Sequence, residues 1–268
     1  MTSINSASTL KTRAYNPFKA LGYQLYCELI RLLRNPGFLI PTLFFPIMFF
    51  SLFGLSGAQQ DIGNGVKLGA YLLASYGTYG TLSAALLGFG VGIAAERGLG
   101  WNRLTRTTPM HPLSYFGAKI MTAMISGLVT LILLFVFGSV VANISLPLET
   151  WLLLIGRLLI GMMPFVALGL FIGYLGNPTS AAPITQLIFL PMSFASGIFL
   201  PISQLPKFVQ DIAPYLPAYH SGQLAWHTLN AGDSSSIETH LLWVLGFTVL
   251  FLALAVWAYK RDEAKQYG

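Results

Sequence analysis

Residues 115–142 read YFGAKIMTAMISGLVTLILLFVFGSVVA, and Lys119 is their only charged side chain. A helix needs roughly 20 mostly apolar residues to cross the hydrocarbon core of a bilayer. This stretch exceeds that length and leaves room for tilt. It therefore predicts a transmembrane helix.

Five further apolar stretches are also long enough to span a membrane. They cover residues 38–57, 68–95, 152–173, 181–200 and 241–259. Prolines inside them, such as Pro46 and Pro191, are tolerated where neighbouring membrane helices satisfy the freed backbone groups. Only 9% of all residues are charged, against roughly 25% in a soluble domain. We therefore predict an all-α membrane protein with six transmembrane helices.

The distribution of lysine and arginine predicts the orientation of these spans. Of the 15 such residues, all except Lys67, Lys207 and Arg157 lie on the side that also holds both termini. Because the side that keeps Lys and Arg is normally cytoplasmic, we expect cytoplasmic termini and a location in the cell inner (plasma) membrane. The net charge of +6 then reflects membrane topology, and no nucleic-acid partner is expected.

The segment before the first span has an amphipathic pattern. Its apolar residues at helical spacing are Phe18, Leu21, Leu25, Leu29, Leu32 and Leu33, whereas Lys19, Glu28, Arg31 and Arg34 take other angles. This pattern favours a helix lying in the cytoplasmic membrane interface. The alternative is a soluble helix packed on a partner. Pro36 marks its expected end.

The longest non-cytoplasmic piece lies between the fifth and sixth spans. Its apolar runs, 208–212 and 224–229, are too short to cross, so they predict short re-entrant helices, with Tyr215, Tyr219 and Trp226 in the outer aromatic belt. The chain is then one transmembrane domain, with a cytoplasmic lead, a six-span core and a cytoplasmic tail, at 1–36, 37–260 and 261–268.

Several enzyme classes are excluded by missing motifs. The sequence has no G-x-x-x-x-G-K-[ST], no H-E-x-x-H and no G-x-S-x-G, so it lacks a P-loop and the commonest zinc-protease and hydrolase arrangements. Acidic side chains are nearly absent from the spans, although ion-coupled carriers usually place them at membrane depth. We expect no catalytic residue and no cofactor in this chain.

No metal site is expected either. Cys27 is the only cysteine, so neither an intramolecular disulfide nor a cysteine-cluster site can form. His220 and His227 are seven residues apart and could share a helix face, but no third ligand is evident. Histidines of the membrane interface are the favoured interpretation.

Small residues within the spans indicate close helix contacts, and polar residues there are candidates for lining a translocation path. Gly88 and Gly92 in the second span, and Gly169 and Gly173 in the fourth, have the G-x-x-x-G spacing of close helix packing. Candidate lining residues of a translocation path are Tyr76, Tyr79, Ser83 and Arg157. Hydrogen bonding between helices is an equally good role for the hydroxyl groups, and Arg157 is shallow enough to extend outward to the interface.

The connection between the second and third spans is the most informative segment. Residues 96–119 read ERGLGWNRLTRTTPMHPLSYFGAK, which resembles the cytoplasmic loop of type-2 ATP-binding-cassette (ABC) exporter permeases, E-R-E-x-G-T-L-E-x-L-x-x-T-P followed by G-K. The matching residues are Glu96, Arg97, Gly100, Thr108, Pro109 and Lys119, whereas Trp101, Asn102 and Arg103 depart from the pattern. Residues 191–217 resemble the family's fifth span and outer segment, with matches at Gly197, Pro201, Leu205, Pro206 and Pro217.

The resemblance implies a permease subunit of an ATP-driven exporter of a hydrophobic or amphipathic compound (a drug, antibiotic or lipid). Its implied partners are a second permease, as homo- or heterodimer, and two copies of an ABC ATPase, which would bind ATP and Mg. The ATPases would press on the loop at Glu96, Arg97, Gly100, Arg103, Leu104, Arg106, Thr108 and Pro109. The path would then run between the first, second and fifth spans of the two permeases.

Other interpretations stay open at this point. Without the resemblance, a basic loop that only sets topology explains residues 96–109 about as well. The chain could also be a stand-alone secondary carrier or channel, or a membrane-embedded enzyme. The missing intramembrane acids count against the carrier, and the missing catalytic clusters count against the enzyme.

Overall fold

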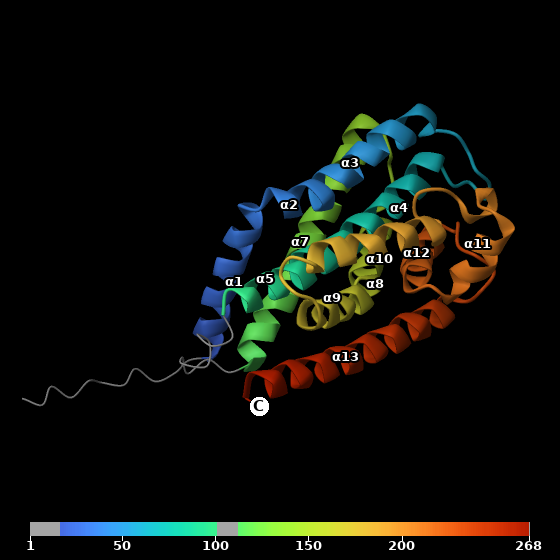
Figure 1. Cartoon of the computed structure of the whole chain (residues 1–268). Coiled ribbons are helices and arrows are strands. Elements are labelled where there is room, and N and C mark those ends of the chain that lie inside the picture. Colours follow the sequence, from blue (N-terminus) through green and yellow to red (C-terminus); the bar gives the residue numbers. More distant parts are fainter. Residues whose placement is uncertain (1–16, 101–111, 268) are drawn as a thin grey trace, which may run out of the picture.

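The computed structural model describes residues 17–100 and 112–267, and the regular elements of this part of the chain are all helices, without a strand. Five of its helical stretches are long and apolar enough to cross a membrane: Pro36–Gly57, Leu68–Gly98, Tyr115–Val141, Leu148–Leu175 and Ile237–Asp262. They coincide with five of the six expected spans. Both α1 (Pro17–Leu33) and the C-terminal end of α13 (Ile237–Tyr267) lie at the same end of the bundle (Figure 1).

The first span is an irregular helix. It consists of α2 (Pro36–Leu39), the π-helical η1 (Ile40–Phe44), α3 (Phe45–Phe49), the π-helical η2 (Phe50–Gly54) and a 3₁₀ turn, η3 (Leu55–Gly57). Asn35 begins it by accepting a hydrogen bond from the Gly37 backbone N–H at 3.1 Å. Pro41 and Pro46 have no N–H to donate within it, and local π and 3₁₀ adjustments commonly satisfy the backbone groups that such prolines free.

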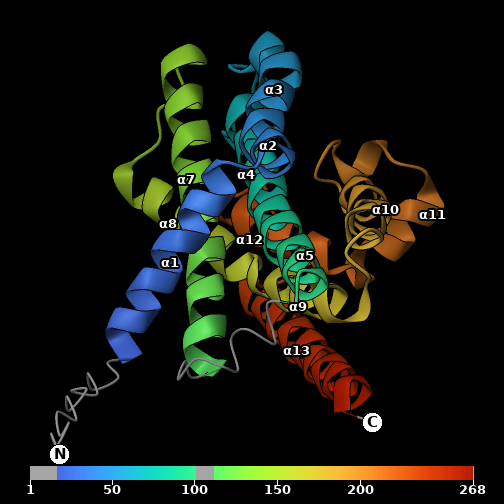
Figure 2. The ribbon, with the colours of Figure 1, turned by 60° about the vertical axis from the view of Figure 1, so that its left-hand side comes forward.

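The second span lies at the centre of the molecule. It comprises α4 (Leu68–Ser83), the π-helical η4 (Ala84–Val91) and α5 (Gly92–Gly98). Within an apolar window of 18 residues, 83% of this span is buried, against 17% of the last span. The other helices therefore surround the second span, and α13 keeps most of its apolar surface outward. Figure 2 shows α4 and α5 between α7 (Pro112–Val141) and α10 (Ala181–Ala195).

The remaining spans pack around this centre. The fourth is broken into α8 (Leu148–Gly161) and α9 (Met163–Leu175), because Pro164 suits the first turn of a new helix but not the interior of one. Helix α13 lies along α9, and α1 lies across α7 (Figure 2). The amphipathic segment is therefore a helix as predicted, but its polar residue Glu28 is buried rather than facing water.

The fifth predicted span is shorter than expected. Helix α10 has only 15 residues, which extend about 22 Å at 1.5 Å per residue, against roughly 30 Å of hydrocarbon. It ends because the chain turns at Gly197, whose φ of +80° lies in the left-handed region that glycine tolerates. The described chain thus has five long apolar helices and one shorter apolar helix, instead of six full-length spans.

Two short helices follow α10, as predicted: α11 (Lys207–Ile212) and α12 (Pro217–Thr228). The expected aromatic belt is wrong for Tyr219 and Trp226, because α12 packs against α4, α8 and α13 and buries both side chains. Trp226 stacks on Tyr71 with ring centroids 5.4 Å apart, and its indole N–H donates to the Ser75 hydroxyl at 2.9 Å. Tyr215 remains exposed.

Candidate functional site

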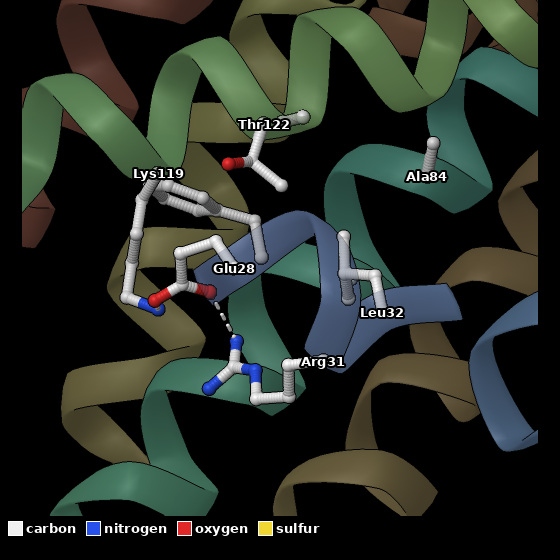
Figure 3. A pocket seen from close by; sticks show the side chains of 9 residues that line it. Glu28, Arg31, Leu32, Ala84, Lys119 and Thr122 are labelled. Carbon is white, nitrogen blue, oxygen red and sulfur yellow. Dashed lines mark hydrogen bonds and ion pairs between the residues drawn. The ribbon is translucent and has the colours of Figure 1, made fainter. Parts of the chain in front are cut away.

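A group of four charged side chains, of which only Arg31 is partly exposed, lies where the second span meets α1 and α7. Lys119 Nζ lies 2.7 Å from both Glu28 Oε1 and Glu96 Oε1. Arg31 pairs with Glu28 at 2.7 Å and also with Glu96. Figure 3 shows Lys119 and Arg31 on either side of the Glu28 carboxylate. We call Glu28, Arg31, Glu96 and Lys119 the ionic cluster.

The ionic cluster is balanced in charge and in hydrogen bonds. It holds two carboxylates and two cations, and the Tyr115 hydroxyl donates to Glu96 Oε2 at 2.6 Å. Removing charges from water costs several kcal/mol per ion, and only close pairing with further hydrogen bonds offsets that cost. A cavity of about 10 Å³ lies beside the cluster, which is room for about one water. The cluster fixes the relative positions of α1, α5 and α7.

Arg97, the next residue after Glu96, contacts the other half of the bundle. Its guanidinium pairs with Asp262 of α13 and donates to the carbonyl oxygens of Gly173 at 2.7 Å and Gly176 at 3.2 Å. It also lies 5.4 Å from the ring centre of Tyr174. The last backbone carbonyl groups of a helix have no partner within it, so a cation at the C-terminal end of α9 can bond to them. Two adjacent residues thus connect α5 to α1, α7, α9 and α13.

Part of the predicted loop site can be followed further. Gly100 adopts φ +73° and its N–H bonds to the Arg97 carbonyl at 3.0 Å, which ends α5 as a glycine cap does. The predicted residues that lie outside the described ranges are Arg103, Leu104, Arg106, Thr108 and Pro109. Sequence reasoning did not assign Glu28, Arg31 or Asp262 to the site. The sequence did hold one indication of these contacts. Glu28 and Arg31 are three residues apart on a helix that a span follows directly.

The candidate path residues fall in two places. Tyr76 and Tyr79 are buried in an aromatic group between the first span, the second span and the end of α10. Phe49 lies 5.7 Å from Tyr79 and 5.1 Å from Phe199, measured between ring centroids. Ser83 lies further along α4, where its hydroxyl donates to the Gly80 carbonyl at 2.9 Å.

Arg157 is not part of this group. It extends from α8 toward α12, where its Nη1 donates to the Thr228 hydroxyl at 2.8 Å. The structure therefore separates it from Tyr76 and Tyr79.

Three hydroxyl groups are buried without a hydrogen-bond partner among the described residues: those of Thr42, Tyr76 and Ser196. They come from the first span, the second span and the turn after α10. A buried polar group without a partner costs roughly 1–3 kcal/mol, so its presence calls for a physical reason. These hydroxyl groups are isolated polar positions in an otherwise apolar interior.

The glycines of the second span face different neighbours. A Cβ on Gly90 would lie 2.8 Å from the Gly169 carbonyl oxygen, and one on Gly173 would lie 2.9 Å from the Gly90 carbonyl oxygen. These glycines allow η4 and α9 to approach backbone to backbone. Gly88 instead faces the Phe38 ring, and Gly92 faces the Arg31 guanidinium. The G-x-x-x-G spacing did not identify Gly90 as a contact residue.

Comparisons with known proteins identify a family for this chain. A family model described as "ABC-2 family transporter protein" matches residues 59–257. A protein of Bacillus subtilis (strain 168), named "Putative transport permease YvfS", is 26% identical over 241 residues, which cover 90% of this chain and 97% of that protein. The family model spans most of the chain, including the second span with Glu96 and Arg97, whereas Glu28, Arg31 and Asp262 lie outside the matched residues. The chain belongs to the ABC-2 family of transporter proteins, as a multi-pass membrane permease that is itself non-catalytic.

Proposed function

We propose that this chain is half of the membrane pathway of an ATP-driven exporter. It pairs with a second permease and with two copies of an ABC ATPase, which bind ATP and Mg, and it moves a hydrophobic or amphipathic compound outward. The observation that carries this proposal is the connection of Glu96 and Arg97 to four separate helices. The loop that follows them is the surface on which the ATPase acts.

The ion pairs explain how such a push reaches the bilayer. A force on residues 101–111 acts directly on α5 and α7, between which that segment runs. Through Glu96 it also reaches α1, and through Arg97 it reaches α9 and α13. Separating these contacts would leave charges unpaired in a mostly buried site, which costs several kcal/mol. The helices at this end therefore move together.

The same proposal assigns six crossings and cytoplasmic termini. Helix α10 begins beside the Arg97 end of the bundle, where Pro178 contacts Gly98, and leads to α11 at the opposite end (Figure 1). A short crossing is tolerated where a bilayer thins or flanking residues reach the interface. The ionic cluster, Arg97 and the tail at Asp262 are then all on the cytoplasmic side.

The translocation path is assigned to the boundary between the first span, the second span and α10. Ligand sites are mostly apolar with a few polar groups that fix orientation. The aromatic group around Tyr76 and Tyr79 has this composition, since the hydroxyls of Tyr76 and Ser196 are without a hydrogen-bond partner among the described residues. A drug, an antibiotic and a lipid all have the apolar body and polar groups that this boundary would accommodate.

Copurification tests the proposal. The full chain, tagged and purified from native membranes in mild detergent, is expected to bring with it a protein that carries a P-loop, in about equal amount. Arg103→Glu reverses a charge in the loop and is expected to lower that recovery several-fold. Lys207→Glu, on an exposed side chain at the other end of the bundle, serves as the matched control and leaves the recovery unchanged.

A stand-alone carrier or channel gives the opposite result. No P-loop protein then copurifies, and the purified chain alone in liposomes releases its cargo without ATP. That pair of observations rejects the exporter.

A further inference from the structure

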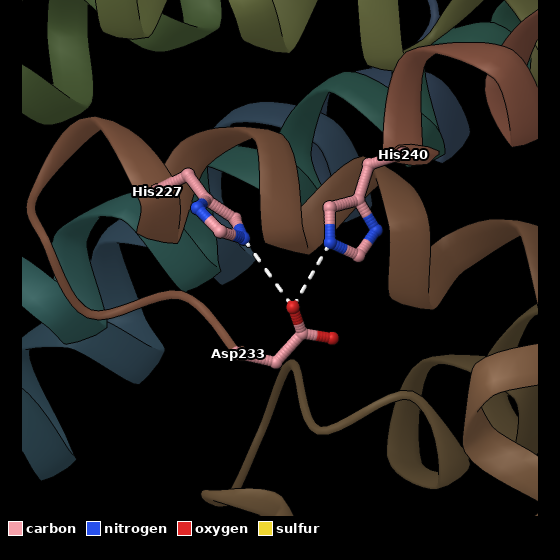
Figure 4. A group of neighbouring side chains, drawn as sticks. All are labelled: His227, Asp233 and His240. Atoms are coloured by element: carbon pink, nitrogen blue, oxygen red, sulfur yellow. Dashed lines mark hydrogen bonds and ion pairs between the residues drawn. The ribbon is translucent and has the colours of Figure 1, made fainter. Parts of the chain in front are cut away.

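Three of the four histidines of the chain gather at the end of the bundle opposite the loop. His227 ends α12, His240 lies in the first turns of α13, and Asp233 lies on the connection between them (Figure 4). The Nε2 atoms of His227 and His240 lie 3.4 and 3.1 Å from the same oxygen, Asp233 Oδ1. His220 contacts His240 from the other side.

The hydrogen bonds around His240 determine which of its ring nitrogens carries a proton. His220 Nε2 lies 2.9 Å from the Pro214 carbonyl oxygen, which only accepts, so this nitrogen carries a proton. The Nδ1 atoms of His220 and His240 are 2.9 Å apart, and only one proton fits between them. With His220 neutral, that proton belongs to His240 Nδ1. The Nε2 atom of a neutral His240 then has a bare lone pair.

That lone pair is directed at a carboxylate. Both oxygens of the Asp233 carboxyl group accept hydrogen bonds, Oδ2 from the Tyr219 hydroxyl at 2.5 Å and Oδ1 from the Ser235 N–H at 2.9 Å. Asp233 is therefore ionised, and its Oδ1 atom accepts hydrogen bonds but cannot donate one. His220 is buried, and its ring nitrogens face a carbonyl oxygen and a second imidazole. A charge on this ring would have no opposite charge in contact with it, so the ring is neutral. Two acceptors 3.1 Å apart repel unless a cation lies between them.

We propose that His227 Nε2, His240 Nε2 and Asp233 Oδ1 bind a divalent transition-metal ion, with Zn²⁺ the best match. Zinc bonds to nitrogen and oxygen are about 2.0–2.2 Å long, which places tetrahedral ligand atoms about 3.3–3.6 Å apart. The two histidine-to-Asp233 distances lie at or just below this range, and all three ligand atoms lie within 4.8 Å of one another. Two imidazoles and a carboxylate suit Zn²⁺ better than Mg²⁺ or Ca²⁺.

The surroundings have the further features of a metal site. Metal-bound histidines usually donate their second ring nitrogen to a fixed acceptor, and His240 donates to His220, whose ring stacks on Trp243 with centroids 5.0 Å apart. The Tyr219 hydroxyl orients Asp233 through its Oδ2 atom at 2.5 Å. Asp233 also lines an open cavity of about 700 Å³, through which an ion can reach the site. The bound ion would join α12 to α13 and so fix the buried outer helix to the last span.

Cobalt titration of the wild-type chain is the primary test. The full chain, carrying a tag without histidine, is stripped with a chelator in detergent at pH 8 and titrated with Co²⁺ alone. We expect one ion per chain, with the visible absorption of four-coordinate Co²⁺, and loss of that absorption when Zn²⁺ is added. A cluster that holds only an extra proton gives no such absorption, and this result overturns the metal site even if every variant misfolds.

Variants locate the bound ion. His240→Ala and Asp233→Ala each remove a ligand and are expected to weaken Co²⁺ binding more than about 100-fold, because even outer partners of metal ligands contribute about 10–100-fold. Tyr219→Phe keeps all three ligands and is expected to weaken binding about tenfold. Asp211→Asn, an exposed acid at the same end, and His111→Ala leave binding unchanged. Equal binding by all of these variants would place the ion elsewhere and contradict the assignment.

Discussion

Glu96 and Arg97 are neighbours in sequence, yet their side chains connect different parts of the bundle. Successive residues of an α-helix point about 100° apart, so Glu96 faces α1 and α7 while Arg97 faces α9 and α13. Both cations that pair with Glu96, Arg31 and Lys119, also pair with Glu28. The group is neutral only while all four members of the ionic cluster are present, which makes it sensitive to the loss of any one.

Lys119→Met tests this charge balance. The change leaves two buried carboxylates with one cation, and breaking a buried pair on one side costs about 3–5 kcal/mol. We expect a fall of several degrees or more in the thermal unfolding midpoint of the purified chain. Adding Glu28→Gln restores neutrality and is expected to recover much of the loss. Lys207→Met, whose ion pair is exposed, should scarcely change the midpoint; an equal fall for both lysines would contradict the argument.

Tyr76→Phe separates stability from transport at the aromatic group. The Tyr76 hydroxyl is buried without a partner among the described residues, so its removal is expected to raise stability by up to about 1 kcal/mol or leave it unchanged. If the hydroxyl contacts cargo, export by the complete complex falls although the permease is no less stable. Thermal unfolding and ATP-dependent export are measured on the same preparation. A destabilised protein with normal export would show that the hydroxyl has a structural partner instead.

At the scale of helices, the contact between η4 and α9 depends on the absence of side chains. Gly90 and Gly169 allow the two backbones to touch, and small residues of this kind allow membrane helices to associate without a hydrophobic driving force. The second span is also π-helical at this point, over Ala84–Val91. Such segments are frequent at functional sites, and this one lies directly before the α5 helix that holds Glu96 and Arg97.

Gly90→Ala is the smallest change that tests this contact. The added methyl group would lie 2.8 Å from a backbone oxygen that cannot rotate away, and overpacking of this kind costs about 1–3 kcal/mol. We therefore expect a lower unfolding midpoint and, in the assembled transporter, weaker stimulation of the ATPase. Gly246→Ala is the matched control, because a Cβ on Gly246 meets nothing within 4 Å. Equal unfolding midpoints for the two variants would show that close packing at Gly90 does not stabilise the protein.

At the scale of the whole molecule, the sequence predicted what depends on length and hydrophobicity. Five spans, the helix before them and the short outer helices follow from runs that a bilayer requires to be apolar. The length of α10 did not follow, because a left-handed turn at Gly197 is not visible in hydropathy. Burial of Glu28 and Trp226 did not follow either, since it depends on Lys119 and Ser75, which are distant in sequence.

The shortness of α10 makes the number of crossings the most informative property to measure. If α10 crosses, the turn before the second span and the segment after α10 lie on the same, outer side; if it does not, they lie on opposite sides. Cys27 is exposed on α1, so a Cys27→Ala background permits single cysteines at Ile62 and Ser203, both of which are exposed. A membrane-impermeant maleimide added to intact cells is expected to label both, whereas Cys27 in the wild-type chain reacts only after the membrane is opened. Labelling of Ile62→Cys without Ser203→Cys would place the two residues on opposite sides of the membrane. That result would contradict the six crossings and also the structure, in which both residues line one cavity.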